Sequence, residues 1–210
     1  METIIPYLTY FLKCFITLFV IVDPPGNLPI FIALTERFEE SIRQRISKRM
    51  TIIAFLILFF TMISGEKLLE FFHVSLNSLR VAGGILLFII SVDILLGRMG
   101  RERYKKRAEK SADVDSVAVF PLALPLYTGP GAITAGIVMF SQSYDTISKI
   151  LVILSAVLVY ILVRLSHIYT GIIIKVLGKS GADIIAKVLA IFLAAIGVEF
   201  VFEGLKNEFL

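Results

Sequence analysis

The polar residues best suited to bind a ligand lie where proline and glycine interrupt two apolar segments. Residues 23–29 read DPPGNLP and supply a carboxylate, Asp23, and an amide, Asn27. Residues 121–131 read PLALPLYTGPG and supply the hydroxyl of Thr128, so the two segments hold six of the seven prolines. Proline removes a backbone donor and clashes with the preceding turn, which predicts a helix break in each segment. Because hydrocarbon offers no water to the freed backbone groups, both breaks must face protein or a wet cavity.

A helix that restarts inside the membrane can bind an anion at its first turn. Asp23 is suited to cap a half-helix whose first residue is Pro24, which would leave the amides of Gly26 and Asn27 free. Such an end carries roughly half a positive charge. The plainer alternatives are that Asp23 only caps its own helix and that Asn27 only joins neighbouring helices. A cap explains the oxygen of Asp23 but not its charge, which costs ~2.5 to 3.5 kcal/mol at mid-membrane.

The second break is expected to repeat this arrangement with Thr128 and Gly129, although Thr128 could simply cap its own helix. Without a neutralising carboxylate, the amides of residues 129–132 are expected to bind the carboxylate of an amino acid. Asp23 would then face a cation, which could be the substrate ammonium, a sodium ion or a proton. Small side chains at the breaks favour glycine, alanine or serine over bulky amino acids. The expected substrate-binding residues are Asp23, Gly26, Asn27, Thr128, Gly129, Gly131, Ala132 and Thr134.

The composition places these breaks in an all-α polytopic membrane protein. Of the 210 residues, 57% are hydrophobic and 18% charged, and the mean hydropathy is +0.88, which excludes an ordinary soluble fold. The single cysteine, Cys14, excludes an intrachain disulfide and a cysteine metal site. His73 and His167 have no second ligand at metal spacing, so neither a metal nor a cofactor is expected. The first apolar run is long enough to be retained, and no cleaved signal is expected.

Six transmembrane helices are expected, the first and fourth of them broken. A charged segment, residues 36–49, separates the first two helices, and residues 68–78 are expected to form a short interfacial helix and turn. The expected membrane-spanning segments are residues 6–34, 51–64, 79–96, 117–140, 147–177 and 186–202.

An internal repeat is visible at an offset of 105 to 106 residues. Four pairs follow it in the same order, although each match alone is weak. The pairs are Pro25-Gly26 with Pro130-Gly131, Ser64-Gly65 with Thr170-Gly171, Asn77 with Asp183, and Asp93 with Glu199. A three-helix unit repeated once gives a 3+3 inverted repeat, as in many secondary transporters. The expected units are residues 1–97, a basic loop at 98–116, and residues 117–210.

The distribution of basic residues predicts the orientation in the membrane. Residues 98–110 carry seven lysines and arginines, and the other loops on the same side are also basic. The positive-inside rule therefore places this loop in the cytoplasm, against anionic lipid, and both termini outside. We expect a multi-pass protein of a prokaryotic cell membrane that does not bind nucleic acid. The sequence does not indicate an oligomeric state.

Charged residues near the ends of spans have two interpretations. Asp93 and Glu199 occupy matching positions in the two halves and are candidates for coupling an ion. They also fit side chains that pair or reach water at the interface at little cost. Arg164 is expected to reach the interface in the same way, and Tyr160 and Tyr169 are typical of interfacial aromatic residues.

Three stretches resemble the MarC family of integral membrane proteins. Residues 21–31 (IVDPPGNLPIF) look like its first signature, residues 125–134 (PLYTGPGAIT) resemble its second, and residues 80–88 (RVAGGILLF) are similar to its glycine-rich third span. The resemblance covers essentially the whole chain. It implies six spans and transport of small neutral amino acids such as glycine and alanine, coupled to sodium or protons. The chain departs from the family pattern at Glu199 and Lys187, where an amide and an arginine are expected.

Three classes of function are therefore weighed. The leading hypothesis is a secondary transporter of small neutral amino acids with a midplane site at the two breaks. The alternative is a passive channel or exporter for small polar solutes, which would need a continuous polar pathway. An enzyme is not expected, because a His-Glu-x-x-His pattern, a cysteine pair and a Gly-x-Gly-Asp motif are absent from the sequence. The sequence decides neither the coupling ion nor the direction of flux.

Overall fold

The computed structural model describes residues 4–35, 38–97 and 114–209, and this part of the chain is helical without strands. Most of the basic loop at 98–116 lies outside the described residues. The elements are α1 (Ile4–Val22), α2 (Leu28–Thr35), α3 (Glu40–Phe71), α4 (Leu76–Leu95), α6 (Val114–Val117), η1 (Ala118–Tyr127), α7 (Pro130–Ser141), α8 (Thr146–Ile168) and α9 (Thr170–Phe209). Segment η1 is kinked, because Phe120 and Leu124 have extended backbone angles.

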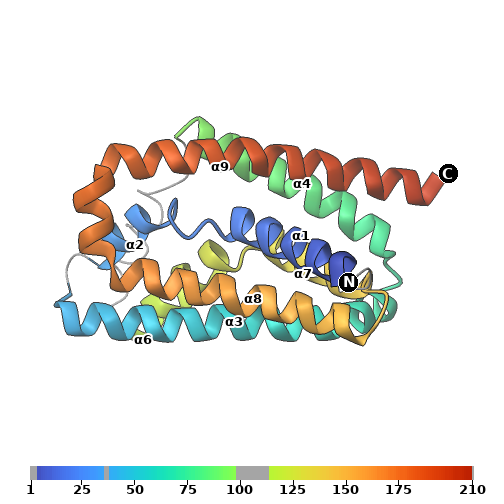
Figure 1. The fold of residues 1–210 in the computed structure, drawn as a ribbon, viewed down its shortest axis with the longest axis horizontal. Coiled ribbons are helices and arrows are strands. Elements are labelled where there is room, and N and C mark those ends of the chain that lie inside the picture. Colours follow the sequence, from blue (N-terminus) through green and yellow to red (C-terminus); the bar gives the residue numbers. More distant parts are fainter. Residues whose placement is uncertain (1–3, 36–37, 98–113, 210) are drawn as a thin grey trace.

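The helices form three layers, as Figure 1 shows. Helices α3 and α8 run along one side, α4 and α9 run along the other, and α1 and α7 lie between them. The start of α1 and the end of α9 lie at one end of the bundle. The start of α3 and the α8–α9 turn lie at the opposite end.

Five helices are long and apolar enough to cross a membrane, and the bent pair η1–α7 raises the number to six. The two helices of that pair meet at an angle of 59°. Many large apolar side chains point outward, for example Phe60 at 61% exposed and Val176 at 76%. Such a surface is compatible with contact to lipid tails, whereas its exposure to water would be unfavourable. The expectation of an all-helical polytopic membrane protein is confirmed.

The second span is longer than the sequence predicted. Helix α3 begins at Glu40 and runs without interruption through the charged segment and through the predicted end of the span at Ser64. Arginine, lysine and glutamate are good helix formers, so charge alone does not end a helix. The separate interfacial helix predicted at residues 68–78 is wrong, because residues up to Phe71 belong to α3. Helix α4 then starts at Leu76, where the Ser75 side chain accepts the Ser78 amide at 2.9 Å.

The end of the fifth span was also predicted wrongly. The apolar pattern continues to residue 177, but α8 ends at Ile168 and the chain turns at Tyr169. This turn contains no proline, so the hydropathy pattern alone does not reveal it. Helix α9 starts at Thr170 and has 40 residues, against a predicted span of residues 186–202.

Glycine permits the close contact between α4 and α9. A Cβ atom added at Gly84 would overlap the carbonyl oxygen of Gly197, and one added at Gly197 would lie 2.7 Å from the carbonyl oxygen of Gly84. Gly204 makes a similar close approach to the backbone of Asn77. Small residues at such crossings let helix backbones touch, which is how helices associate in lipid. The order of these contacts shows that α4 and α9 run antiparallel.

Candidate functional site

The first helix break is a single tight turn. Helix α1 ends at Val22 because the next residues include Pro24 and Pro25. Asp23 has a φ of 47°, in the left-handed region that L-residues seldom adopt. The Asn27 amide donates to the Asp23 carbonyl at 3.0 Å and closes the turn. Helix α2 follows from Leu28.

The polar groups of this turn bind one another. The Gly26 amide donates to Oδ1 of Asp23 at 3.0 Å, and Nδ2 of Asn27 donates to the carbonyl of Val22 at 2.9 Å. A Cβ at Gly26 would overlap the Asp23 carboxylate. The prediction that the Gly26 and Asn27 amides are free is therefore wrong, as is the prediction that the half-helix starts at Pro24. Proline cannot donate, so the chain closes a carboxylate-capped turn before α2 begins.

The second break is built differently. The Thr128 hydroxyl donates to the carbonyl of Ala54 in α3 at 2.9 Å and also pairs with the hydroxyl of Tyr160 in α8. Thr128 is fully buried, and its amide donates to the Ala123 carbonyl at 2.9 Å. It joins three helices and does not cap α7, so the expected repetition of the Asp23 arrangement is wrong. Gly129 stands at the cap position, without a side chain to accept a bond.

The first turn of α7 presents free backbone donors. Pro130 has no amide hydrogen, and the Ile133 amide donates to the Gly129 carbonyl at 3.1 Å. For the amides of Gly131 and Ala132, the described part of the chain supplies no hydrogen-bond acceptor. Both residues are buried. A buried helix end with unpaired amides is the kind of site that binds an anion.

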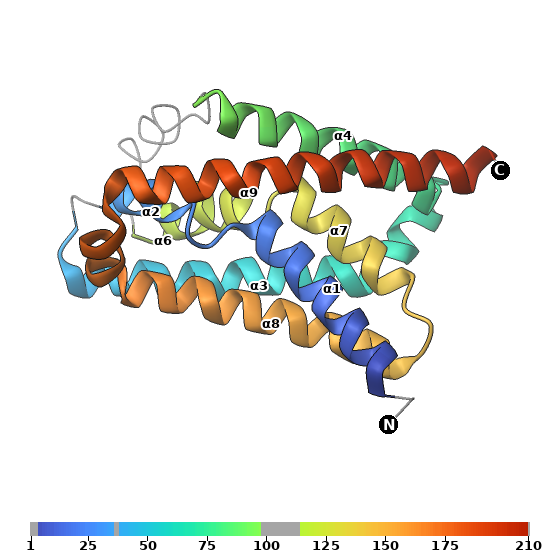
Figure 2. The same ribbon diagram turned by 45° about the horizontal axis from the view of Figure 1, so that its top comes forward.

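The two breaks lie together in the middle of the molecule. A Cβ at Gly131 would lie 3.7 Å from the side chain of Ile21, next to Asp23. Asp23 also lies within electrostatic range of Tyr127, the last residue of η1. In Figure 2 the end of α1 and the start of α7 are close to one another. Segments about 105 residues apart in the sequence thus meet at one place.

A hydrogen-bonded chain leads from the second break toward the start of α3. The Tyr127 hydroxyl pairs with Nε2 of His167 at 2.8 Å, and Nδ1 of His167 pairs with the Ser47 hydroxyl at 2.9 Å. Nη1 of Arg164 donates to Ser47 and to Oε1 of Gln44, each at 2.7 Å. Tyr127, His167 and Ser47 are fully buried. These hydrogen bonds therefore connect η1 to α3 and α8.

This network changes the interpretation of three residues. Arg164 contacts α3 instead of reaching only for the interface. Tyr160 is 2% exposed and donates to the Tyr127 carbonyl at 3.2 Å, so its assignment as an interfacial aromatic is wrong, whereas Tyr169 is exposed. His167 stacks on Phe31 with ring centroids 3.8 Å apart and an interplanar angle of 8°.

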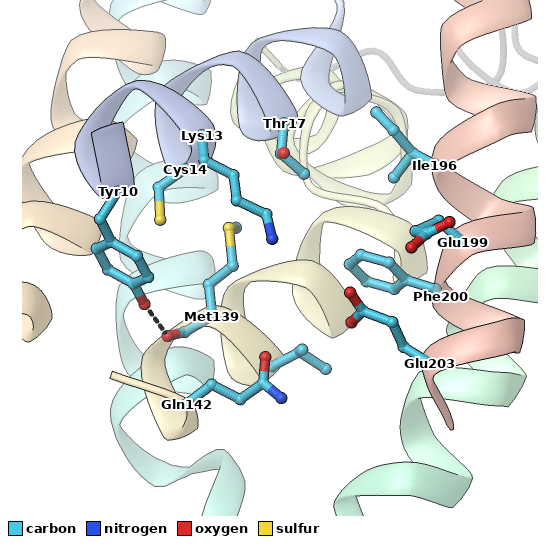
Figure 3. Close-up of a pocket in the computed structure, with 11 residues that line it drawn as sticks. Tyr10, Lys13, Cys14, Thr17, Met139, Gln142, Ile196, Glu199, Phe200 and Glu203 are labelled. Carbon is cyan, nitrogen blue, oxygen red and sulfur yellow. Dashed lines mark hydrogen bonds between the residues drawn. The ribbon is translucent and has the colours of Figure 1, made fainter. Parts of the chain in front are cut away.

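A cavity of about 340 Å³ lies between α1, α7 and α9 (Figure 3). It is partly open to the outside of the bundle, and residues of the two breaks do not line it. The side chains of Lys13, Glu199 and Glu203 point into it. Its lining residues are Tyr10, Lys13, Cys14, Thr17, Val138, Met139, Gln142, Ile196, Glu199, Phe200 and Glu203.

Behind this cavity lies a buried arginine. The side chain of Arg80 in α4 is 0% exposed, and its three nitrogens have no hydrogen-bond partner among the residues that the structure describes. Its ion pair with Glu203 has an Nη1–Oε2 distance of 3.7 Å, beyond hydrogen-bond length. A buried guanidinium with five donors needs an acceptor, because an unpaired buried charge costs several kcal/mol.

Comparison with known proteins decides the family. The model of the MarC family of integral membrane proteins matches residues 8–209. The chain belongs to the MarC family. It is 69% identical to a UPF0056 membrane protein of Archaeoglobus fulgidus, over 96% of this chain and 95% of the relative.

More distant MarC relatives align over nearly their full length. A UPF0056 membrane protein of Methanocaldococcus jannaschii is 34% identical over 97% of this chain and 99% of its own. YhcE of Escherichia coli is 31% identical over 99% of this chain and 97% of its own. These names describe the relatives as membrane proteins and do not mention an activity. No solved structure matches the chain.

The remaining predicted site residues of this MarC protein lie apart from one another. Thr134 is buried and packs on Gly83 of α4, one helical turn beyond the α7 donors. Glu199 lies in the wall of the cavity. Asp93 is half-buried near the end of α4, on the other side of the Gly84–Gly197 contact, so the two candidate ion-coupling residues are not brought together.

Sequence reasoning missed Arg80 and Glu203 as functional candidates. Arg80 is the second residue of the third predicted span and stands one turn inside α4; an ionisable residue within a span is a functional candidate by default. Glu203 directly follows the sixth predicted span, and no local motif singles it out. Only the antiparallel packing of α4 on α9 reveals that the two face each other.

Proposed function

We propose that this MarC protein is a secondary transporter of small neutral amino acids, with a central site at the two helix breaks. The observation that carries the proposal is the meeting of the breaks, where Asp23 and the α7 amides lie in one buried region. Interrupted helices near the midplane are the usual binding sites of secondary transporters. The names of the MarC relatives neither state nor exclude this activity.

The chemistry of the breaks suits a zwitterion. The unpaired amides of Gly131 and Ala132 would accept a carboxylate. Asp23 offers the only carboxylate within the two described break segments, and it would face the ammonium, a sodium ion or a proton. Asn27 and Thr134 would supply neutral hydrogen bonds. The side chain of Leu87 packs against Gly131 and limits the space, which favours glycine, alanine or serine.

The pairing of helices supports a 3+3 inverted repeat. Helix α1 of the first half packs on α8 of the second half, and α7 of the second half packs on α3 of the first. In the same way, α4 packs on α7 while α9 packs on α1, and α3–α8 and α4–α9 pair with each other. A twofold exchange of α1, α3 and α4 with α7, α8 and α9 maps this set of contacts onto itself. Two such halves could alternate around a central site.

Reconstitution tests the proposal directly. Purified protein in liposomes should take up labelled glycine and alanine with saturable kinetics, driven by an imposed sodium or proton gradient. Leucine, which is too large for the site, should neither be taken up nor compete, and protein-free liposomes give the background. Flux that rises linearly with concentration would instead indicate a channel. Absence of gradient-dependent uptake in both directions would contradict a secondary transporter.

The orientation has its own test. We propose that both termini lie outside and that residues 98–110 lie in the cytoplasm. A single cysteine introduced as Ser111→Cys in a Cys14→Ala background should react with an impermeant maleimide only after cells are permeabilised. Labelling in intact cells would contradict this orientation and indicate the opposite one.

A further inference from the structure

The buried Arg80 and the cavity in front of it form a second polar site, separate from the helix breaks. Arg80 lies on the face of α4 that also carries Gly83 and Leu87, which pack on Thr134 and Gly131 of α7. It is completely enclosed, and none of its nitrogens makes a hydrogen bond within the described part of the chain. A guanidinium binds carboxylates through two parallel hydrogen bonds, and here neither is formed.

Glu203 forms an ion pair with Arg80, but it does not form these hydrogen bonds. Its carboxylate is 3.7 Å from the Arg80 guanidinium, and its side chain, which is 39% exposed, lines the cavity. Figure 3 shows its carboxylate at the cavity wall beside Glu199. The side chain is therefore free to rotate into the cavity. Such a rotation would leave the guanidinium open to a carboxylate that enters from the same cavity.

We propose that the cavity between α1, α7 and α9 is an outer binding station for an amino acid zwitterion. Arg80 binds the substrate carboxylate after Glu203 moves aside, and Glu199 binds the ammonium. This inference rests on the proposed transport function, whose central site lies deeper, at the breaks.

The charges and size of the cavity favour this occupant. Glu199 and Glu203 are one helical turn apart on α9, and Arg80 lies against Glu203, so an ammonium at Glu199 and a carboxylate at Arg80 would each meet an opposite charge. A volume of about 340 Å³ holds a small amino acid with some water. Among the described residues that line the cavity, Lys13 is the one cation, and it is exposed. An exposed lysine is solvated by water and binds an anion weakly, whereas the enclosed Arg80 has no such alternative.

The test measures binding to purified protein by calorimetry with three probes: glycine, glycinamide and acetate. Wild-type protein should bind glycine and acetate but bind glycinamide at least tenfold more weakly. Arg80→Gln should weaken glycine and acetate about tenfold or more, the loss of a charged hydrogen-bonded pair. Lys13→Gln, which removes the other cavity cation, should change either affinity less than twofold.

A second variant covers the case in which Arg80→Gln does not fold. Glu203→Gln keeps Arg80 and removes its competitor, so acetate should bind several-fold more tightly. Unchanged acetate affinity in Glu203→Gln would contradict the proposal, as would a folded Arg80→Gln protein that binds glycine like wild type. If only Lys13→Gln loses glycine and acetate affinity, Lys13 and not Arg80 binds the carboxylate, which would also contradict the proposal.

The same experiments separate this inference from the transport proposal. Arg80-dependent acetate binding in a protein that transports no amino acid would overturn the proposed function and leave the carboxylate site standing. Glycine uptake with an unchanged KM in Arg80→Gln would support transport and overturn the outer station.

Discussion

The two helix breaks use their polar residues in opposite ways. At the first break, Asp23 and Asn27 satisfy backbone groups of their own turn, so the break holds a carboxylate in place and the Gly26 and Asn27 amides are paired. At the second break, Thr128 bonds to α3 and α8, and the amides of Gly131 and Ala132 have no acceptor among the described residues. One break therefore supplies a carboxyl group, and the other supplies donors. The repeat preserves the position of the breaks but not their chemistry.

The glycines at the two breaks should show the largest effect. Gly26→Leu would push a side chain into the Asp23 carboxylate, and Gly131→Leu would push one into Leu87 at the α7 donors. Either change should abolish glycine uptake by proteoliposomes. Gly171→Leu is the matched control, because no atom lies within 4 Å of a Cβ placed there. Wild-type uptake by Gly131→Leu would show that the α7 amides do not belong to the substrate site.

The buried hydroxyl of Thr128 should have the next largest effect, and on stability. Thr128→Val removes the hydroxyl that bonds to the Ala54 carbonyl and one of the two partners of the Tyr160 hydroxyl, which costs about 1 to 3 kcal/mol. Thermal unfolding in detergent should show a lower midpoint for Thr128→Val and a near-normal one for Thr128→Ser. Thr9→Val is the control, because the exposed Thr9 hydroxyl bonds only within its own helix. Equal midpoints for both valine variants would mean that Thr128 does not join the helices.

Asp145 tests the capping role of an aspartate away from the membrane centre, and its effect should be the smallest. It accepts the Ser148 amide at 2.8 Å, as Asp23 accepts that of Gly26, and the Tyr7 hydroxyl at 2.6 Å. The hydrogen bond from Tyr7, helped by the Ser148 amide, lowers the pKa of Asp145.

A lowered pKa fixes the sign of the pH dependence. The folded state favours the ionised form of Asp145, so its stabilisation is present above the unfolded pKa of about 3.9 and is lost as the pH falls through the lower folded value. Asp145→Asn should lower the unfolding midpoint slightly at pH 7 and match wild type in strong acid. A gap between the two proteins that widens as pH falls would show the opposite linkage.

Features marked by proline were predictable from the sequence. The breaks at Asp23 and Thr128 follow from missing backbone donors, and the membrane class follows from apolar composition. Helix ends without proline were not predictable: α3 continues through its charged segment, and α8 turns into α9 inside an apolar run. Local chemistry permits a helix in both places, and only packing decides where it ends.

Partners across the bundle were equally out of reach of sequence reasoning. The pattern could suggest that Thr128 caps α7, because capping depends on neighbours in sequence. Its actual partners, Ala54 and Tyr160, lie on other helices, and so does the Glu203 that faces Arg80. Only the register of α4 on α9 and of η1 on α3 brings these groups together.

The central claim is that the charge of Asp23 serves the substrate or its coupling ion and not only its own turn. Asp23→Asn tests this most directly, because asparagine keeps an oxygen for the Gly26 amide and removes only the charge. Uptake and binding of glycine should be measured in wild type, Asp23→Asn and Asp145→Asn, with sodium and pH varied separately. We predict that Asp23→Asn loses the ion dependence of uptake and at least tenfold of glycine affinity, while Asp145→Asn retains both. Unchanged affinity and unchanged ion dependence in Asp23→Asn would contradict the account and leave Asp23 as a cap.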